Sequence, residues 1–390
     1  MISVEEALKL VEANIPTGKV ETISLTESLG YTLSKNISSP IDMPPFPQSA
    51  MDGYAVNYDD TISEYKLVGE VAAGSDQKFN LAKGEAVRIF TGAAVPLSAN
   101  TVVRQEDVLK KQDKISFIAE IKLNHNIRPQ AEQIKKGDNA LSAGTYIDPA
   151  TLGYIATLGL TSIEVYSKPK VAILTTGDEL VKPGEALTYG KVSESNSVML
   201  DAAFRSKGIS TISHLKIQDD YAATVNAIKS VIESNDFVIL SGGISVGDYD
   251  FVGKALEELR VEQIFYKVKQ KPGKPLYFGK KGRTTIFALP GNPAAAFTSV
   301  YVYIYPSLQQ FQGGNFNGCT RFHLPISEDY NRKAQRAEFL KGKMIAGKIE
   351  VLNAQSSAML SSFSEADCLI YVPESQSSYK KGDLVKCLII

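Results

Sequence analysis

Three acidic residues, Glu179, Asp219 and Asp250, follow short apolar runs that we interpret as buried strands. The carboxyl ends of parallel strands meet at one edge of a sheet, where ligands bind. Carboxylate oxygens without histidine or cysteine suit Mg²⁺, which bridges to substrate phosphates. Asp220 is better placed to cap the helix that begins at residue 221, so Asp219 is the preferred ligand of that pair. We therefore expect Glu179, Asp219 and Asp250 to form a metal site, with solvated loop acids as the alternative.

Two glycine-containing segments at the same edge are suited to anion binding. Residues 241–250 (SGGISVGDYD) allow backbone N–H groups to approach an anion, and the helix that follows adds its positive end. They lack the Gly-Lys-Ser/Thr ending of a Walker loop and the GxGxxG pattern. Residues 290–293 (PGNP) open a helix with Asn292 as N-cap and Pro293 at the first helical position. The structural alternatives are a tight strand-to-helix turn and a well-capped helix.

Lysines crowd around a Pro-Gly turn at residues 272–273. In a strand, Lys267, Lys269 and Lys271 would share one face, and Lys274 follows the turn. The row is either an oxyanion pocket or a solvent-facing row that protects an edge strand.

The elements that must position these residues alternate between strand and helix from about residue 168 to 312. In chain order we expect a strand at 171–174, a helix at 197–207, a strand at 211–217, a helix at 221–233, a strand at 237–240, a helix at 250–259, a hairpin at 275–279 and 284–289, and a helix from Pro293. This alternation indicates an α/β fold with a parallel, doubly wound sheet.

The flanking segments have different patterns. Residues 3–14 are predicted to form an amphipathic helix, with Ser3 and Glu6 at capping-box spacing. A proline-rich turn at 40–47 marks a boundary. Short strands follow from about 50 to 136, where 101–108 is expected to pair with 115–121, and 148–160 is predicted to be helical again. Residues 320–390 are predicted to form a small β-barrel.

Composition narrows the class of protein. The chain has 390 residues, enough for two to four domains, with 42 Lys and Arg against 43 Asp and Glu. This near balance gives no global attraction to nucleic acid or to an anionic membrane. Three scattered cysteines form neither a disulfide framework nor a zinc module. The start, MISVEEALKL, is no signal peptide, and the apolar stretch 294–305 falls short of the ~20 residues that span a bilayer. We expect a cytoplasmic protein without nucleic-acid or membrane partners.

Taken together, six motifs resemble the MoeA family, which includes the E-domain of gephyrin. They occur in the family's order and span nearly the whole chain. They are 47–55 (PQSAMDGYA), 88–93 (RIFTGA), 171–180 (VAILTTGDEL), 241–250 (SGGISVGDYD), 271–275 (KPGKP) and 289–293 (LPGNP).

The resemblance implies a fold of four parts and an elongated homodimer. The parts are a discontinuous linker domain at 1–45 and 138–167, an inserted β-domain at 46–137, a molybdopterin-binding α/β domain at 168–313 and a C-terminal β-barrel at 314–390. In the implied homodimer, the active cleft would lie between the α/β domain of one subunit and the linker and insert regions of the other. Asp52 and Thr91 would then come from the partner subunit. Further implied partners are a molybdopterin adenylyltransferase and molybdoenzyme maturation proteins.

The resemblance also implies a reaction, the insertion of molybdate into adenylylated molybdopterin with Mg²⁺-dependent release of AMP. Glu179, Asp219 and Asp250 would hold the metal or position water. Lys267, Lys271 and Lys274 would offset the charge of the molybdate dianion. Arg336 would assist these lysines. The residues implied to bind the pterin phosphate and nucleotide are Thr176, Gly177, Ser241, Gly242, Gly243, Ser245, Gly247, Pro290, Gly291, Asn292 and Pro293.

Several positions depart from the family pattern, including a turn variation at 98–100 (SAN), and two of them concern charged groups. Gln133 replaces a usual carboxylate, and Lys341 replaces a common arginine, which would give one point charge in place of a bidentate fork. Two other functions stay open from the sequence. A molybdopterin adenylyltransferase resembles the α/β domain alone, and a non-catalytic carrier or scaffold would bind the pterin without releasing AMP.

Overall fold

The computed structural model describes residues 1–244, 251–332 and 335–390. The chain separates into two compact units. Unit 1 comprises Met1–Ile23, Ser28–Ser34 and Glu164–Ile390, and unit 2 comprises Ser24–Glu27 and Lys35–Ile163. Within the described residues, no helix is both long and apolar enough to cross a membrane.

Unit 1 contains the predicted α/β sheet, which has six strands in the order β16-β13-β17-β21-β20-β18. Their bounds are β13 Val171–Thr176, β16 Ile212–Ile217, β17 Phe237–Ser241, β18 Glu262–Tyr266, β20 Tyr277–Lys281 and β21 Thr284–Leu289. The first four strands in this order are parallel, and β20 and β18 extend the sheet in antiparallel fashion. The parallel core and the hairpin β20–β21 confirm the expectation from the sequence, whereas β18 was not predicted.

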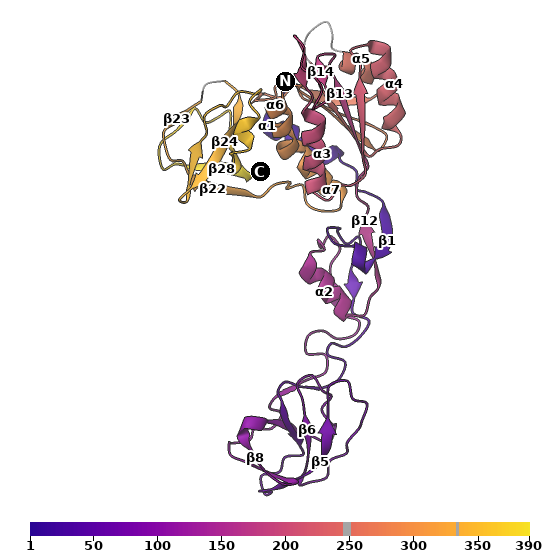
Figure 1. Cartoon of the computed structure of the whole chain (residues 1–390), viewed down its shortest axis with the longest axis vertical. Helices are drawn as coiled ribbons and strands as arrows, with labels where there is room; N and C mark the ends of the chain where they lie inside the picture. The colour runs from indigo at the N-terminus through magenta and orange to yellow at the C-terminus, as the bar shows by residue number, and fades with distance from the viewer. Residues whose placement is uncertain (245–250, 333–334) are drawn as a thin grey trace. The chain divides into compact units, whose positions relative to one another are not determined.

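Helices cover both faces of this sheet. They are α1 Val4–Asn14, α3 Asn196–Ser206, α4 Tyr221–Ile232, α5 Phe251–Glu258, α6 Pro293–Ser299 and α7 Tyr305–Phe311, with a π-helical turn at Val300–Ile304 before α7. Strand residues such as Ile173 and Ile239 pack with α1, α3, α6 and α7 on one face. Their chain neighbours, such as Leu174 and Leu240, pack with α4 and α5 on the other. Because side chains alternate along a strand, a sheet covered on both faces needs continuous apolar runs such as 171–174. Figure 1 shows α3 on one side of β13 and α4 and α5 on the other.

The predicted helix starts are confirmed by their caps. The Ser3 side chain accepts a hydrogen bond from the Glu6 amide at 3.1 Å, and the Asp220 carboxylate accepts one from the Ala223 amide at 2.7 Å. Each side chain satisfies an amide that has no partner within the helix. Asp220 is therefore the cap of α4, which leaves Asp219 free of that role, as expected.

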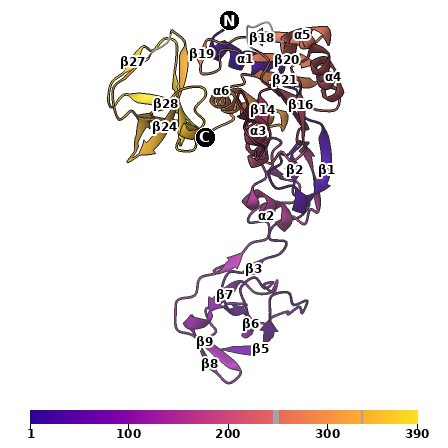
Figure 2. The ribbon, with the colours of Figure 1, turned by 45° about the horizontal axis from the view of Figure 1, so that its top comes forward.

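The C-terminal segment of unit 1 forms a second sheet in the order β19-β24-β26-β28-β22, with β25 paired to β24. The strands are β22 Arg321–Pro325, β24 Ala337–Ile345, β25 Lys348–Val351, β26 Cys368–Val372 and β28 Leu384–Ile389, and β23 Tyr330–Asn331 pairs separately with β27 Ser378–Tyr379 (Figure 2, yellow). The edge strand β19, Gln270–Lys271, comes from the α/β segment and runs parallel to β24. This pairing was not predicted, and it joins the lysine turn to the C-terminal sheet.

Unit 2 contains another six-stranded sheet, in the order β7-β4-β6-β5-β9-β8. Its strands are β4 Gly53–Val56, β5 Tyr65–Val71, β6 Glu85–Ile89, β7 Thr101–Arg104, β8 Val108–Lys111 and β9 Lys114–Phe117. The predicted hairpin is present as β8 and β9, but β7 pairs with β4 instead. The expectation that all of 101–108 pairs with 115–121 was therefore wrong, because the 3-10 turn Gln105–Asp107 separates β7 from β8.

The remaining elements of the chain are short. Unit 2 also contains α2, Pro149–Thr157, and the pairs β2 Ile37–Ser38 with β11 Asn139–Leu141 and β3 Gln48–Ser49 with β10 Ile127–Arg128. The pair of β2 with β11 joins segments that lie on either side of the β-module in the sequence. The strands β1 Val20–Ser24 and β12 Ser162–Tyr166 pair with each other, and β14 Leu180–Val181 pairs with β15 Val192–Ser193 in unit 1.

Candidate active site

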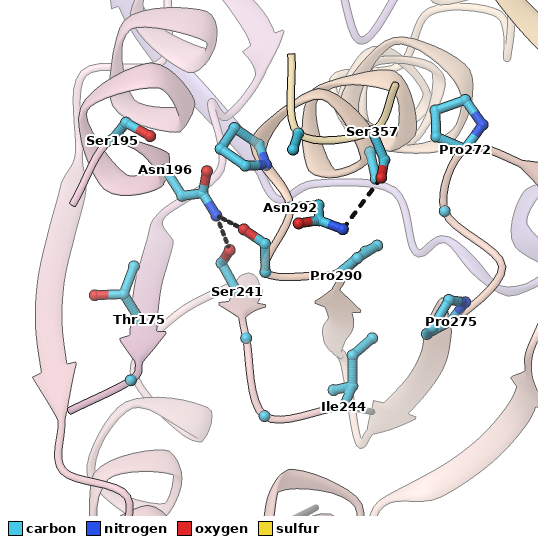
Figure 3. Close-up of a pocket in the computed structure, with 18 of the residues that line it drawn as sticks. Thr175, Ser195, Asn196, Ser241, Ile244, Pro272, Pro275, Pro290, Asn292 and Ser357 are labelled. Carbon is cyan, nitrogen blue, oxygen red and sulfur yellow. Dashed lines mark hydrogen bonds between the residues drawn. The ribbon is translucent and has the colours of Figure 1, made fainter. Parts of the chain in front are cut away.

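A cavity of about 1050 Å³ lies in unit 1 at the carboxyl ends of the parallel strands. Strand register places it there, because Thr175 is paired with Ser241 and Ser241 with Leu289. The loops after β13, β16, β17 and β21 therefore leave the sheet at one edge. Of the predicted site residues, the cavity is lined by Thr176, Gly177, Glu179, Asp219, Ser241, Gly242, Gly243, Lys271, Lys274, Pro290, Gly291, Asn292, Pro293 and Arg336. Figure 3 shows Thr175 and Asn196 on one side and Pro272 and Pro275 on the other.

The start of the glycine loop can be built only from glycine. Gly242 has φ of +96° and Gly243 of +65°, a region that favours glycine. A Cβ on Gly242 would lie 2.7 Å from the carbonyl oxygen of Thr176. The backbone of the loop therefore packs directly on the end of β13 and is exposed to the cavity. Ser245, Gly247 and Asp250, which we also predicted to belong to the site, lie outside the described residues.

Asn196 is a cavity residue that the sequence analysis missed. Its side chain is only 9% exposed and donates to the Ser241 hydroxyl and to the Gly291 carbonyl, each at 2.8 Å (Figure 3). The adjacent Glu194 is also buried and accepts hydrogen bonds from the amide and hydroxyl of Ser197. Asn196 thus joins the start of α3 to the loops after β17 and β21. Its position directly before a predicted helix was the available signal.

Asn292 occupies the predicted N-cap position of α6, but its side chain makes no capping hydrogen bond. It donates instead to the Ser357 hydroxyl at 3.1 Å (Figure 3). The prediction of the helix start is confirmed and the expected capping role was wrong, because the side chain is used to contact the C-terminal segment.

Glu179, Glu194 and Asp219 are the acidic residues that line the cavity, and Glu194 is hydrogen-bonded to Ser197. The Asp219 carboxylate accepts from the Asp178 amide at 3.1 Å, and the Asp178 carboxylate accepts from the Asp219 amide at 3.3 Å. This reciprocal pair fixes the loops after β13 and β16 to each other. Gly177 leaves space for the Glu179 carboxylate, since a Cβ there would lie 2.8 Å from it. Among the described residues, no group of three acidic, histidine or cysteine side chains is arranged to hold a metal ion.

Lys271, Lys274 and Arg336 provide the basic part of the cavity. Arg336 donates to the carbonyl of Gln270 at 3.3 Å, which attaches the start of β24 to β19. Lys267 is not among the described residues that line the cavity. The backbone at Lys267 has φ of +72°, and strand β18 ends at the residue before it. The Lys267 ammonium lies 4.7 Å from the centre of the Tyr266 ring. The expectation that Lys267, Lys269 and Lys271 share a strand face was therefore wrong.

Residues 355–358, in the loop after β25, also line the cavity and were not predicted. Lys341, only 3% exposed, donates to the carbonyls of Ala354, Ser356 and Met359 at 2.9, 3.4 and 3.3 Å. Its ammonium is thus used to hold this loop rather than to bind an anion directly. The loop is far from the α/β motifs in sequence and has no local pattern that indicates binding.

Asp52 and Thr91 form a separate pair in unit 2. The Asp52 carboxylate accepts from both the amide and the hydroxyl of Thr91, each at 2.8 Å. These hydrogen bonds, with a smaller contribution from Arg88, lower the pKa of Asp52 below its ordinary value. Antiparallel pairing of Gly53 with Ile89 explains the contact, because both residues then lie at the same end of β4 and β6.

Arg88 supports this pair from the strand side. Its guanidinium lies 5.0 Å from the centres of the Tyr54 and Phe90 rings and donates to the Gly53 carbonyl at 3.2 Å. Gln133, which replaces the family's carboxylate, is exposed, and its backbone N–H donates to the Met43 carbonyl at 2.9 Å.

Comparison with known proteins covers the whole chain. Residues 2–159 match the MoeA N-terminal region (domain I and II), 172–310 the probable molybdopterin binding domain and 323–390 the MoeA C-terminal region (domain IV). The molybdopterin molybdenumtransferase of Haemophilus influenzae is 32% identical over 396 residues, which are 99% of this chain and 98% of that protein. The chain belongs to the MoeA family. The resemblance that the six motifs indicated is thereby confirmed.

Other relatives support the same family assignment. The molybdopterin molybdenumtransferase of Staphylococcus epidermidis is 29% identical over 100% of this chain and 95% of that protein. The crystal structure of the molybdopterin biosynthesis MoeA protein from Pyrococcus horikoshii OT3 has a TM-score of 0.87 and 28% identity, covering 100% of both chains. As a MoeA chain, this protein is a transferase of molybdenum cofactor biosynthesis, and the multidomain α/β fold is confirmed.

Proposed function

We propose that this MoeA chain inserts molybdate into adenylylated molybdopterin and releases AMP in a Mg²⁺-dependent reaction. The observation that carries the proposal is the composition of one cavity. A glycine-lined edge, three carboxylates and three cations line the same space of about 1050 Å³. Of the carboxylates, Glu194 already accepts hydrogen bonds from Ser197. A substrate with a phosphate group, an anhydride and a bound oxyanion needs these three kinds of group together.

The phosphorylated part of the substrate is assigned to the glycine loop and the 290–293 turn. The loop at Gly242 and Gly243 is open to the cavity, and α6 begins at Pro293 beside it. Backbone amides at such positions stabilise phosphate oxygens without a full positive charge. Asn196 and Ser241 then fix the distance between the two loops, so that both contact one ligand.

The residues present fit a magnesium ion held mainly by its substrate. Glu179 and Asp219 offer carboxylate oxygens at the cavity wall. Mg²⁺ is commonly bound by one or two carboxylates together with substrate phosphates and water, so a complete protein cage is not required. When bound, the ion would neutralise phosphate charge and orient the anhydride. Asp250 stays a predicted third ligand.

Lys271 and Lys274 are assigned to molybdate, with Arg336 beside them. A dianion in a partly enclosed cavity requires compensating positive charge, and two ammonium groups with one guanidinium supply it. The role of Lys267 in charge compensation has less support, because its ammonium contacts Tyr266.

We further propose that the protein acts as a cytoplasmic homodimer in which Asp52 and Thr91 serve the cavity of the partner subunit. The support is that these residues form their own hydrogen-bonded pair in unit 2, whereas the described cavity lining belongs entirely to unit 1. A molybdopterin adenylyltransferase would supply the substrate, and molybdoenzyme maturation proteins would receive the product.

The test supplies purified protein with adenylylated molybdopterin, Mg²⁺ and molybdate, and measures AMP release and molybdenum bound to the pterin. We expect both from the wild type, and AMP release should slow at least tenfold in Asp219→Asn, which removes one carboxylate charge. A folded protein that produces neither AMP nor molybdenum-pterin would contradict the proposal. Tight pterin binding alone would favour a carrier, and synthesis of adenylylated pterin from ATP would favour an adenylyltransferase.

A further inference from the structure

A buried carboxylate lies directly behind the basic part of the cavity. Glu338 is 0% exposed, and its Oε1 lies 3.2 Å from the Lys271 ammonium. Its Oε2 accepts a hydrogen bond from the Tyr330 hydroxyl at 2.6 Å. Glu338 does not line the cavity itself, but it contacts a lysine that does.

The backbone fixes this contact. Strand β19 runs parallel to β24, and their register pairs Lys271 with Glu338 and Gln270 with Ala337. Side chains of paired residues on neighbouring strands project to the same face, so the ammonium and the carboxylate are held together by the sheet. The Lys271 side chain is 42% exposed, which leaves it free to contact a ligand in the cavity as well.

Tyr330 keeps the second carboxylate oxygen occupied. Burial and the nearby Glu338 carboxylate raise the pKa of Tyr330, so the phenol stays protonated and donates. One carboxylate oxygen is thus assigned to a neutral donor and the other to Lys271. The negative charge of Glu338 therefore acts mainly on the cavity lysine.

We infer that Glu338 is an internal counter-ion of the oxyanion subsite, which weakens the hold of Lys271 on a bound dianion. The inference rests on the proposed function, because it takes Lys271 as a ligand of molybdate. With Glu338 present, an arriving oxyanion must share the lysine with a carboxylate that cannot leave. The anion is therefore bound loosely enough to be transferred to the pterin rather than retained by the protein.

The size of the effect of Glu338 on oxyanion binding follows from the repulsion between its carboxylate and the bound anion. An oxyanion in contact with Lys271 is separated from Glu338 by little more than the width of one ammonium group. At an effective dielectric constant of about 20, repulsion over such a distance corresponds to roughly tenfold or more in Kd. A residue that only positioned Lys271 would have the opposite effect, since its removal would loosen the lysine and weaken binding.

The experiment measures molybdate and tungstate binding to the full chain by titration calorimetry at low and high salt. Glu338→Gln keeps an oxygen for Lys271 and removes the charge. We expect roughly tenfold tighter binding, with the gain reduced at high salt. Glu350→Gln, an exposed position on β25, removes the same charge elsewhere in the same sheet and should change Kd less than twofold.

A second variant, at Tyr330, keeps the negative charge of Glu338. Tyr330→Phe removes the neutral donor, so more of the Glu338 charge acts on Lys271 and molybdate binding should weaken about twofold to threefold. This variant also serves if Glu338→Gln fails to fold. Unchanged or weaker binding by folded Glu338→Gln, or tighter binding by Tyr330→Phe, would overturn the inference alone. Absence of binding by both the wild type and Glu338→Gln would overturn the oxyanion subsite itself, and the inference with it.

Discussion

The Asn196 side-chain amide donates to the Ser241 hydroxyl and to the Gly291 carbonyl, each at 2.8 Å, and so connects the start of α3 to the end of β17 and to the loop after β21. Replacement of Asn196 by Ala would leave the Gly291 carbonyl without this donor. We expect a loss of about 1–3 kcal/mol in the free energy of unfolding and weaker binding of the adenylylated pterin. Urea unfolding and ligand titration measure the two effects. Asn139→Ala removes an exposed contact to Ser142 and is the control. Equal stability of the two variants would argue against this role.

Gly242→Ala tests whether the glycine loop depends on close backbone contact. The left-handed φ alone costs roughly 1–2 kcal/mol for alanine, and the new Cβ would also lie 2.7 Å from the Thr176 carbonyl oxygen. Gly382→Ala is a matched control, because its φ is +94° and nothing lies within 4 Å of the added Cβ. We expect Gly242→Ala to be clearly less stable than the control in thermal unfolding. Similar losses in both would mean that only the backbone angle matters.

Thr91→Val removes the hydroxyl donor to Asp52 and keeps the side-chain shape. The pKa of Asp52 should rise towards its ordinary value, because a hydrogen bond to the charged form is lost. Since the folded pKa is depressed, its contribution to stability is present above the unfolded pKa and is lost as pH falls through the folded pKa. The variant should lose less stability on acidification. Carboxyl NMR titration checks this, with Asp59 as the internal control because Lys83 and Thr61 set its low pKa.

Mixed dimers test whether Asp52 serves the partner subunit. Asp52→Ala and Asp219→Asn chains with different tags are co-expressed, and the heterodimer is purified through both tags. If the two residues belong to cavities shared between subunits, each heterodimer has one intact site and should release AMP at about half the wild-type rate. Each homodimer should be nearly inactive. An inactive heterodimer would place both residues in the same subunit's site.

Much of the α/β segment could be predicted, because its strands and helix starts are determined by residues that are close in sequence. Apolar runs at 171–174 and 237–240 form buried strands, and Asp220 caps α4 as its position before the helix indicated. The cavity edge followed from strand order alone, since parallel strands share one carboxyl edge.

Several features of the cavity could not be predicted, because they depend on contacts between residues that are distant in sequence. Asn292 contacts Ser357 rather than capping its own helix, and Lys341 holds the loop that carries Ser357. Lys267 leaves the expected lysine row because the chain turns there with positive φ. Local periodicity gives no information on which of several strands a short segment such as β19 will join.

The pairing of β19 with β24 has a consequence for shortened relatives and for engineering. A chain that ended before residue 321 would keep the sheet edge and the glycine loop but would lose Arg336 and the strand against which Lys271 is aligned. Such a fragment would retain Lys271 and Lys274, but Lys271 would no longer be held against Glu338. The proposed oxyanion subsite therefore depends on the C-terminal segment, although its two lysines lie in the α/β segment.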